Sequence, residues 1–107
     1  MVKVVRLAPE YECDPLWLST QSGVENIPAC HLPIDAALVD EVQKWGAEYE
    51  ATYVPEDPLA SGFSTPREES DFVERGRDIA HRLAEELGST WCVYFSVPGA
   101  GPREKIT

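Results

Sequence analysis

Hydrophobic residues recur with a helical period in two segments of the chain. The first stripe comprises Ile34, Leu38, Val42, Trp45 and Tyr49, and the second comprises Phe72, Gly76, Ile79, Leu83 and Leu87. Spacings of three and four place each set on one face of an α-helix. The pattern therefore predicts helices near residues 35–53 and 66–87, each with one apolar face to bury.

Residues typical of helix ends flank both stripes. Asp35 precedes the first stripe as an N-cap, and Pro55 ends that helix because the residue before a proline is disfavoured in the helical region. Thr65 and Glu68 have the spacing of a capping box at the start of the second helix. Gly88 supplies the left-handed residue that ends it. Both helices are therefore predicted to have defined ends, with a loop between them.

Short runs rich in valine and aromatic residues predict strands towards both ends of the chain. Residues 2–8 hold three valines, and residues 91–97 alternate two sets of side chains between the faces of a strand. A weaker strand is predicted over residues 16–21, which stop at a Ser-Gly pair. Residues 23–33 show no period, and we expect them to be irregular.

The order of these elements, β-(β)-α-α-β, indicates the fold class. Two amphipathic helices bury their stripes most economically by packing on one face of a small sheet, which we expect to have two to four strands. The sequence thus predicts a single α+β domain over residues 1–107. Residues 98–107 begin with a run of proline and glycine and are predicted to form a flexible tail.

The chain is strongly acidic. It has 107 residues, with 9 Lys+Arg against 19 Asp+Glu, which gives a formal net charge of −10 and a sequence pI of about 4.5. This balance argues against DNA, RNA and anionic membranes as partners, because all three require a basic footprint. It favours fast encounter with a protein that carries a basic surface, although an acidic coat also serves solubility alone.

Negative charge is concentrated between residues 35 and 57, where seven acidic residues accompany only Lys44. The second helix is more balanced, because two of its aspartates each precede an arginine by four residues and can pair with it. Those pairs are Asp71 with Arg75 and Asp78 with Arg82. The first helix and the loop after it are therefore predicted to form an exposed negative strip. Its predicted partner-binding residues are Asp40, Glu41, Glu48, Glu50, Glu56 and Asp57.

Trp17 is a further candidate for partner binding. It falls on the strand face opposite Leu16 and Leu18. If that face is open to solvent, Trp17 is an anchor of the kind that dominates protein interfaces. The alternative is that Trp17 packs beneath the loop over residues 9–15.

Residue types that occur in catalytic and metal sites are present without the spacing those sites require. Cys30 and His31 are adjacent, but a closed zinc site needs a second close pair. Glu10, Glu12 and Asp14 alternate without the further ligands and turn glycine of a calcium loop. We therefore expect no metal and no cofactor. Three widely spaced cysteines and an N-terminus without a secretory pattern favour a cytoplasmic location.

Several short motifs span residues 11–95. They are Pro15-Leu16-Trp17, Leu32-Pro33-Ile34 before the helix that holds Trp45, Asp57-Pro58, and Ser61-Gly62-Phe63. With them the chain resembles a group of small acidic bacterial proteins, and in size and charge it is similar to the immunity proteins that neutralise bacterial toxins. The resemblance implies no catalytic residue.

The leading hypothesis is a non-enzymatic binding protein, an immunity-type inhibitor of a basic toxin or nuclease. One alternative is a small enzyme that uses Cys30, His31 or nearby carboxylates. The other is a structural or regulatory subunit whose acidic face only coats the surface.

Overall fold

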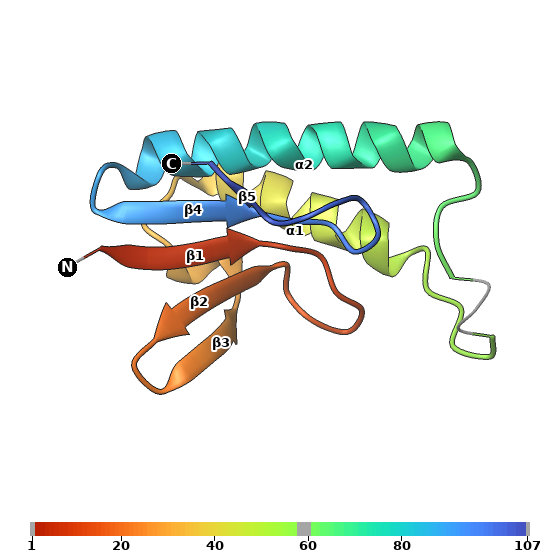
Figure 1. The fold of residues 1–107 in the computed structure, drawn as a ribbon, viewed down its shortest axis with the longest axis horizontal. Helices are drawn as coiled ribbons and strands as arrows, with labels where there is room; N and C mark the ends of the chain where they lie inside the picture. The colour runs from red at the N-terminus through yellow and green to blue at the C-terminus, as the bar shows by residue number, and fades with distance from the viewer. Residues whose placement is uncertain (1, 58–60, 107) are drawn as a thin grey trace.

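The computed structural model describes residues 2–57 and 61–106, so Pro58 of the Asp57-Pro58 motif lies outside the described residues. The elements along the chain are β1 (Lys3–Leu7), β2 (Leu16–Thr20), β3 (Gly23–Ile27), the 3-10 helix η1 (Ala29–His31), α1 (Ala36–Glu50), α2 (Pro66–Leu87), β4 (Trp91–Phe95) and β5 (Glu104–Lys105). Figure 1 shows these elements as one sheet with both helices beside it. The fold class is α+β, as the sequence predicted.

The sheet has five strands in the order β3-β2-β1-β4-β5, not the two to four that we expected. The central strand β1 pairs antiparallel with β2 and parallel with β4. Parallel pairing requires a long crossover, which α1 and α2 provide between β3 and β4. The first and last thirds of the chain therefore meet at the middle of the sheet.

Strand β3 occupies residues that were predicted to be irregular, and that prediction was wrong. A tight turn joins it to β2: the Thr20 hydroxyl donates to the Gly23 carbonyl at 2.9 Å and accepts from the Ser22 amide at 3.2 Å. In β3 only Ile27 is buried. An edge strand with one buried side chain shows no hydrophobic alternation, so the sequence pattern does not reveal it.

The segment predicted to be a flexible tail contains strand β5. The Ile106 amide donates to the Val93 carbonyl at 2.8 Å, beside the pairing of β5 with β4. From α2, Arg77 donates to both carboxylate oxygens of Glu104, at 3.0 and 3.2 Å. This pairing lowers the pKa of Glu104, because the guanidinium favours the charged carboxylate. Contacts with residues far away in the chain hold this segment in place.

The predicted helix starts are confirmed. Asp35 Oδ1 accepts from the Leu38 amide at 2.7 Å, and Thr65 Oγ1 accepts from the Glu68 amide at 3.1 Å. The Glu68 carboxylate accepts from the Ser64 amide, one residue before the position expected in a capping box. Helix α2 has the bounds that its stripe predicted.

Helix α1 ends at Glu50, three residues before the predicted end. The Thr52 hydroxyl donates to the Tyr49 carbonyl at 2.6 Å, so a side chain satisfies that carbonyl. The amides of Thr52 and Tyr53 bond to carbonyls three residues back, which tightens the last turn. The helical ladder therefore closes before Pro55 is reached.

The two helical stripes and the inward faces of the strands share one hydrophobic cluster. Trp45 is at its centre and is 2% exposed. Its ring stacks on Phe72 with centroids 4.5 Å apart, and its indole N–H donates to the Phe72 carbonyl at 2.9 Å. Gly76 permits this approach, because a Cβ there would lie 2.3 Å from Trp45 Cζ2 and 2.8 Å from Phe95 Cε1.

Candidate functional site

Three of the six predicted acidic contact residues form ion pairs within the chain. Both carboxylate oxygens of Glu48 accept from Arg75 Nη1, at 2.5 and 2.6 Å. Glu41 pairs with Arg82, and Asp40 pairs with Lys44 at 2.8 Å. These pairs reduce the negative field of α1 at close range.

Two arginines of α2, Arg75 and Arg82, pair with carboxylates of α1 instead of with their own helix. The expected pairs of Arg75 with Asp71 and of Arg82 with Asp78 are not among the ion pairs of the described residues. The groove between the helices has a volume of about 520 Å³. It is lined by three carboxylates and three cations together with two apolar residues: Glu41, Lys44, Trp45, Glu48, Arg75, Asp78, Ile79 and Arg82. A groove with balanced charge has little to attract a basic partner.

The other predicted acidic residues, Glu50, Glu56 and Asp57, are exposed at the C-terminal end of α1 and in the loop after it. Within residues 2–57 and 61–106, none of the three forms an ion pair. Glu50 instead accepts from the Glu12 amide at 2.8 Å, and Glu12 has a positive φ of 61°. This contact brings the loop over residues 9–14 to the end of α1, where Asp14 also lies.

Glu12, Asp14 and Glu50 line one hollow of about 350 Å³. We call these three carboxylates, together with Glu10, Glu56 and Asp57, the acidic end. No ion pair of the described residues neutralises any of them. Negative charge is therefore uncompensated here, unlike in the groove.

A stack of three tyrosines stands at the acidic end. Tyr11 lies between Tyr49 and Tyr53, with ring centroids 4.6 Å away on each side. The Tyr11 hydroxyl and the Thr52 hydroxyl are 2.9 Å apart and hydrogen-bonded. Burial raises the pKa of Tyr49 to about 12, with the Tyr11 phenol and the Glu10 carboxylate adding to the effect. All three rings are half-buried and offer rigid aromatic area beside the carboxylates.

Sequence reasoning missed the tyrosine stack as a functional candidate. One signal was present, since Tyr49 and Tyr53 are four residues apart and continue the helical stripe. Nothing local indicates that Tyr11 inserts between them, because that contact joins residues about forty positions apart. The fold, not the motif, assembles the stack.

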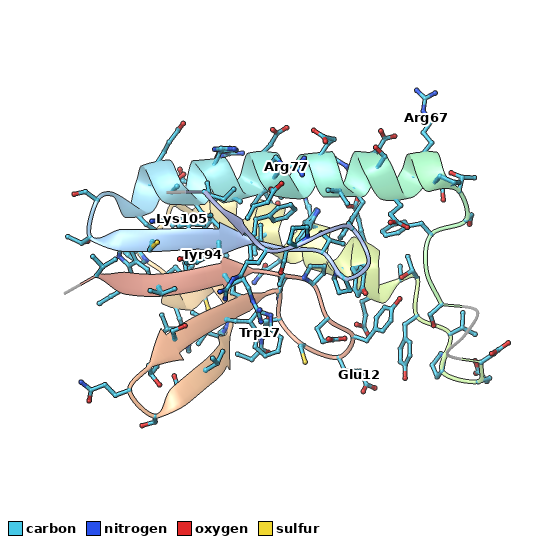
Figure 2. The ribbon with its side chains drawn as sticks, in the orientation of Figure 1. Glu12, Trp17, Arg67, Arg77, Tyr94 and Lys105 are labelled. Atoms are coloured by element: carbon cyan, nitrogen blue, oxygen red, sulfur yellow. The ribbon has the colours of Figure 1, made fainter. Side chains whose placement is uncertain are left out.

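Trp17 lies on β2, on the side of the sheet that points away from the helices (Figure 2). Its indole N–H donates to the Ala8 carbonyl at 2.9 Å, and the ring is half-buried. Trp17 therefore packs against the start of the loop over residues 9–15 and still presents part of its ring. Figure 2 labels it on β2, with Tyr94 on β4 and Lys105 on β5.

The residues of the enzymatic alternative are solvent-exposed. Cys30 and His31 lie on η1, and both are open to solvent. Such positions lack the enclosed environment in which a catalytic thiol and imidazole are tuned. Across residues 2–57 and 61–106, no group of three or more His, Cys, Asp or Glu side chains is placed to hold a metal ion.

None of the helices in the described ranges combines the length and the apolar character needed to cross a membrane.

Comparison with known proteins gives one family. No curated protein matches the chain. The sequence profile of a family described as Serratia CdiI immunity protein-like matches residues 3–97. Because that match covers nearly all of the sequence, the chain belongs to the Serratia CdiI immunity protein-like family.

Proposed function

We propose that this immunity-type inhibitor binds its toxin through the acidic end, and that the surface it covers is the basic substrate cleft of a nuclease. Membership of the family makes the chain a toxin inhibitor. The observation that supports the acidic end is the distribution of ion pairs. Two of the three carboxylates in the groove, Glu41 and Glu48, are paired with arginines, whereas no carboxylate of the acidic end forms an ion pair with a described residue.

The acidic end combines long-range attraction with short-range anchoring. A net charge of −10 steers a basic partner towards the molecule, which raises the association rate. At contact, Tyr11 and Tyr53 supply the kind of residue that dominates interface energetics. Asp40, Glu41 and Glu48 contribute to the field with less effect at contact, because each already has a cationic partner.

The same proposal sets the location of the protein. A nuclease toxin acts where its nucleic-acid substrate is, so its inhibitor is expected in the bacterial cytoplasm. Cys13 and Cys30 are exposed thiols, which suits a reducing compartment.

Charge reversal at the acidic end tests the proposal. The partner is the cognate toxin domain, and the variant is Glu50→Lys combined with Asp57→Lys. We expect the association rate to fall about tenfold at low salt, and its salt dependence to flatten, because these charges steer the encounter.

Glu85→Lys is the control for that variant. Glu85 is exposed near the C-terminal end of α2, at the opposite end of the molecule from the acidic end (Figure 1). If Glu85→Lys slows association as much as Asp57→Lys alone, net charge alone acts and the proposed site is wrong.

A third variant separates binding from the enzymatic alternative. Cys30→Ser with His31→Ala changes exposed side chains on η1, and neither residue lines the hollow of the acidic end. We expect it to bind and inhibit the toxin as the unchanged chain does. Loss of protection with unchanged binding would favour the enzymatic alternative.

A further inference from the structure

The outer face of the sheet carries cations without ion-pair partners. Arg6, Arg103 and Lys105 form no ion pair within the described residues, although the chain has 19 acidic residues. By contrast, four of the five Lys and Arg residues on the helices form ion pairs, namely Lys44, Arg75, Arg77 and Arg82; Arg67 at the start of α2 pairs with no described residue. A local surface of opposite sign to the whole molecule is therefore available to a partner.

Strand register places these cations among aromatic rings. Arg6 is paired with Trp17 on β2 and with Tyr94 on β4, and Lys105 on β5 is paired with Tyr94. Residues directly opposite each other point to the same face of a sheet. We call this set the basic–aromatic row: Trp17, Arg6, Tyr94 and Lys105, with Arg103 over the Tyr94 ring.

The rings hold the two guanidiniums in place. The guanidinium carbon of Arg103 is 4.7 Å from the Tyr94 ring centroid, and that of Arg6 is 6.0 Å from the Trp17 centroid. A guanidinium that lies over a ring keeps the N–H donors at its edge free. Those donors form a fork that matches a carboxylate.

The basic–aromatic row adjoins the acidic end. Arg6, Trp17 and Arg103 line a hollow of about 310 Å³ whose rim includes Glu10 and Pro98. Pro98 also lines the neighbouring hollow beside Tyr11. Glu10 is the one carboxylate among the residues that line the first hollow. A single partner can therefore contact both surfaces.

Two other classes of occupant fit this row poorly. A nucleic acid carries negative charge along its whole length, so a chain with a net charge of −10 repels it. Guanidiniums already lie over one face of Trp17 and of Tyr94, where a base would stack. A second copy of this chain also carries −10, and the two copies repel each other.

We propose that the basic–aromatic row is a second part of the toxin interface, where it binds a carboxylate-bearing segment of a toxin that is basic elsewhere. The identity of the partner rests on the proposed function above. An interface with both signs of charge fixes the orientation of the partner, because a rotated arrangement would place like charges together.

The sign of a charge-reversal effect tests this inference. Arg103→Glu makes the inhibitor more acidic, so steering of a basic toxin alone predicts equal or faster association. The basic–aromatic row predicts instead that dissociation becomes at least about tenfold faster, because a carboxylate of the toxin then faces another carboxylate.

Arg67→Glu is the matched control for Arg103→Glu. Arg67 is exposed at the start of α2 and points away from the sheet (Figure 2). We expect the Arg67→Glu variant to dissociate from the toxin at a rate within about twofold of that of the unchanged chain. Equal dissociation rates for the two variants, with both folded by circular dichroism, would overturn the inference. This result is independent of the acidic-end reversal, so either proposal can fail alone.

A titration without the toxin examines the basic–aromatic row directly. The probes are a short peptide of alternating glutamate and glycine, its glutamine counterpart, and a short oligothymidylate, added to ¹⁵N-labelled protein. We expect the indole signal of Trp17 and the Nε–H signals of Arg6 and Arg103 to shift with the glutamate peptide, and not with the glutamine peptide.

The remaining outcomes of the titration count against the inference. Equal shifts with both peptides, or no shift at millimolar peptide, would overturn it. Larger shifts of the same signals with oligothymidylate would indicate a nucleic-acid surface. Shifts that depend only on protein concentration would indicate a second copy of the chain as the occupant.

Discussion

Replacing Gly76 with alanine tests the packing that joins the two helices to the sheet. By helix propensity alone, Gly76→Ala within α2 stabilises the protein by about 1 kcal/mol. The structure predicts the opposite sign. The new Cβ would lie 2.3 Å from Trp45 Cζ2, 2.6 Å from Cε2 and 2.8 Å from Phe95 Cε1.

The cost follows from what Trp45 would have to give up. Its ring must move by about 1 Å or more to reach ordinary carbon–carbon contact, and overpacking of this kind costs about 1–3 kcal/mol. The same movement strains the hydrogen bond from the Trp45 indole to the Phe72 carbonyl, and leaving that buried pair unmade costs about 1–3 kcal/mol. We expect a net loss of about 2–4 kcal/mol after the gain in helix propensity.

Urea unfolding followed by circular dichroism measures this change. With a slope of about 1–3 kcal/mol per molar urea, the midpoint should fall by about 0.7–4 M. Gly46→Ala is the matched control, because the three atoms nearest its Cβ would all belong to the Pro15 side chain, at 3.0–3.7 Å. We expect that variant to stay within about 1 kcal/mol of the unchanged chain.

Repeating Gly76→Ala in a Trp45→Phe variant tests whether the cost arises from contact with the Trp45 ring. Trp45→Phe removes the larger indole ring, so Gly76→Ala should cost at least about 1 kcal/mol less in that background. An increase in stability on Gly76→Ala, or an equal cost in both backgrounds, would refute the packing argument.

Three further predictions concern the helix cap, a tyrosine and the C-terminal strand. Thr65→Ala should destabilise the chain by about 1 kcal/mol in thermal melting, because it removes the N-cap of α2; no change would mean that this cap does not stabilise the helix. Since the pKa of Tyr49 is raised from 10.0 to about 12, the folded chain keeps a proton between those pH values that the unfolded chain loses. Stability should therefore fall as pH rises through that window, and Tyr49→Phe should reduce the fall and remove the last step of the tyrosine absorbance titration. Arg77→Met should return the pKa of Glu104 towards its ordinary range and speed hydrogen exchange at the Ile106 amide, both measured by NMR; unchanged exchange would show that Arg77 does not hold β5.

Features with local signals were predictable from the sequence. Helix α2 has the predicted bounds because Thr65 and Gly88 act through residues within one turn. Strands β3 and β5 escaped prediction because edge strands bury few side chains. In β3 only Ile27 is buried, and β5 has two residues.

The candidate site was less predictable than the fold. The acidic composition of residues 35–57 is visible in the sequence, but which carboxylates stay unpaired depends on contacts between distant residues. Glu41 finds its partner Arg82 forty-one positions away. The tyrosine stack and the basic–aromatic row also join residues from separate elements, so no local pattern signals them.

The parallel pairing of β1 with β4 has a consequence for the order in which the protein forms. Residues 3–7 leave the ribosome well before their partners in β4, which are residues 91–95. Until those residues emerge, β1 has an open edge, and Val5 and Leu7 lack one of their strand neighbours. Closing so long a loop slows folding relative to local pairing. Synthesis must therefore pass β4 before the sheet can close, and a chain that stops within α2 exposes an aggregation-prone edge.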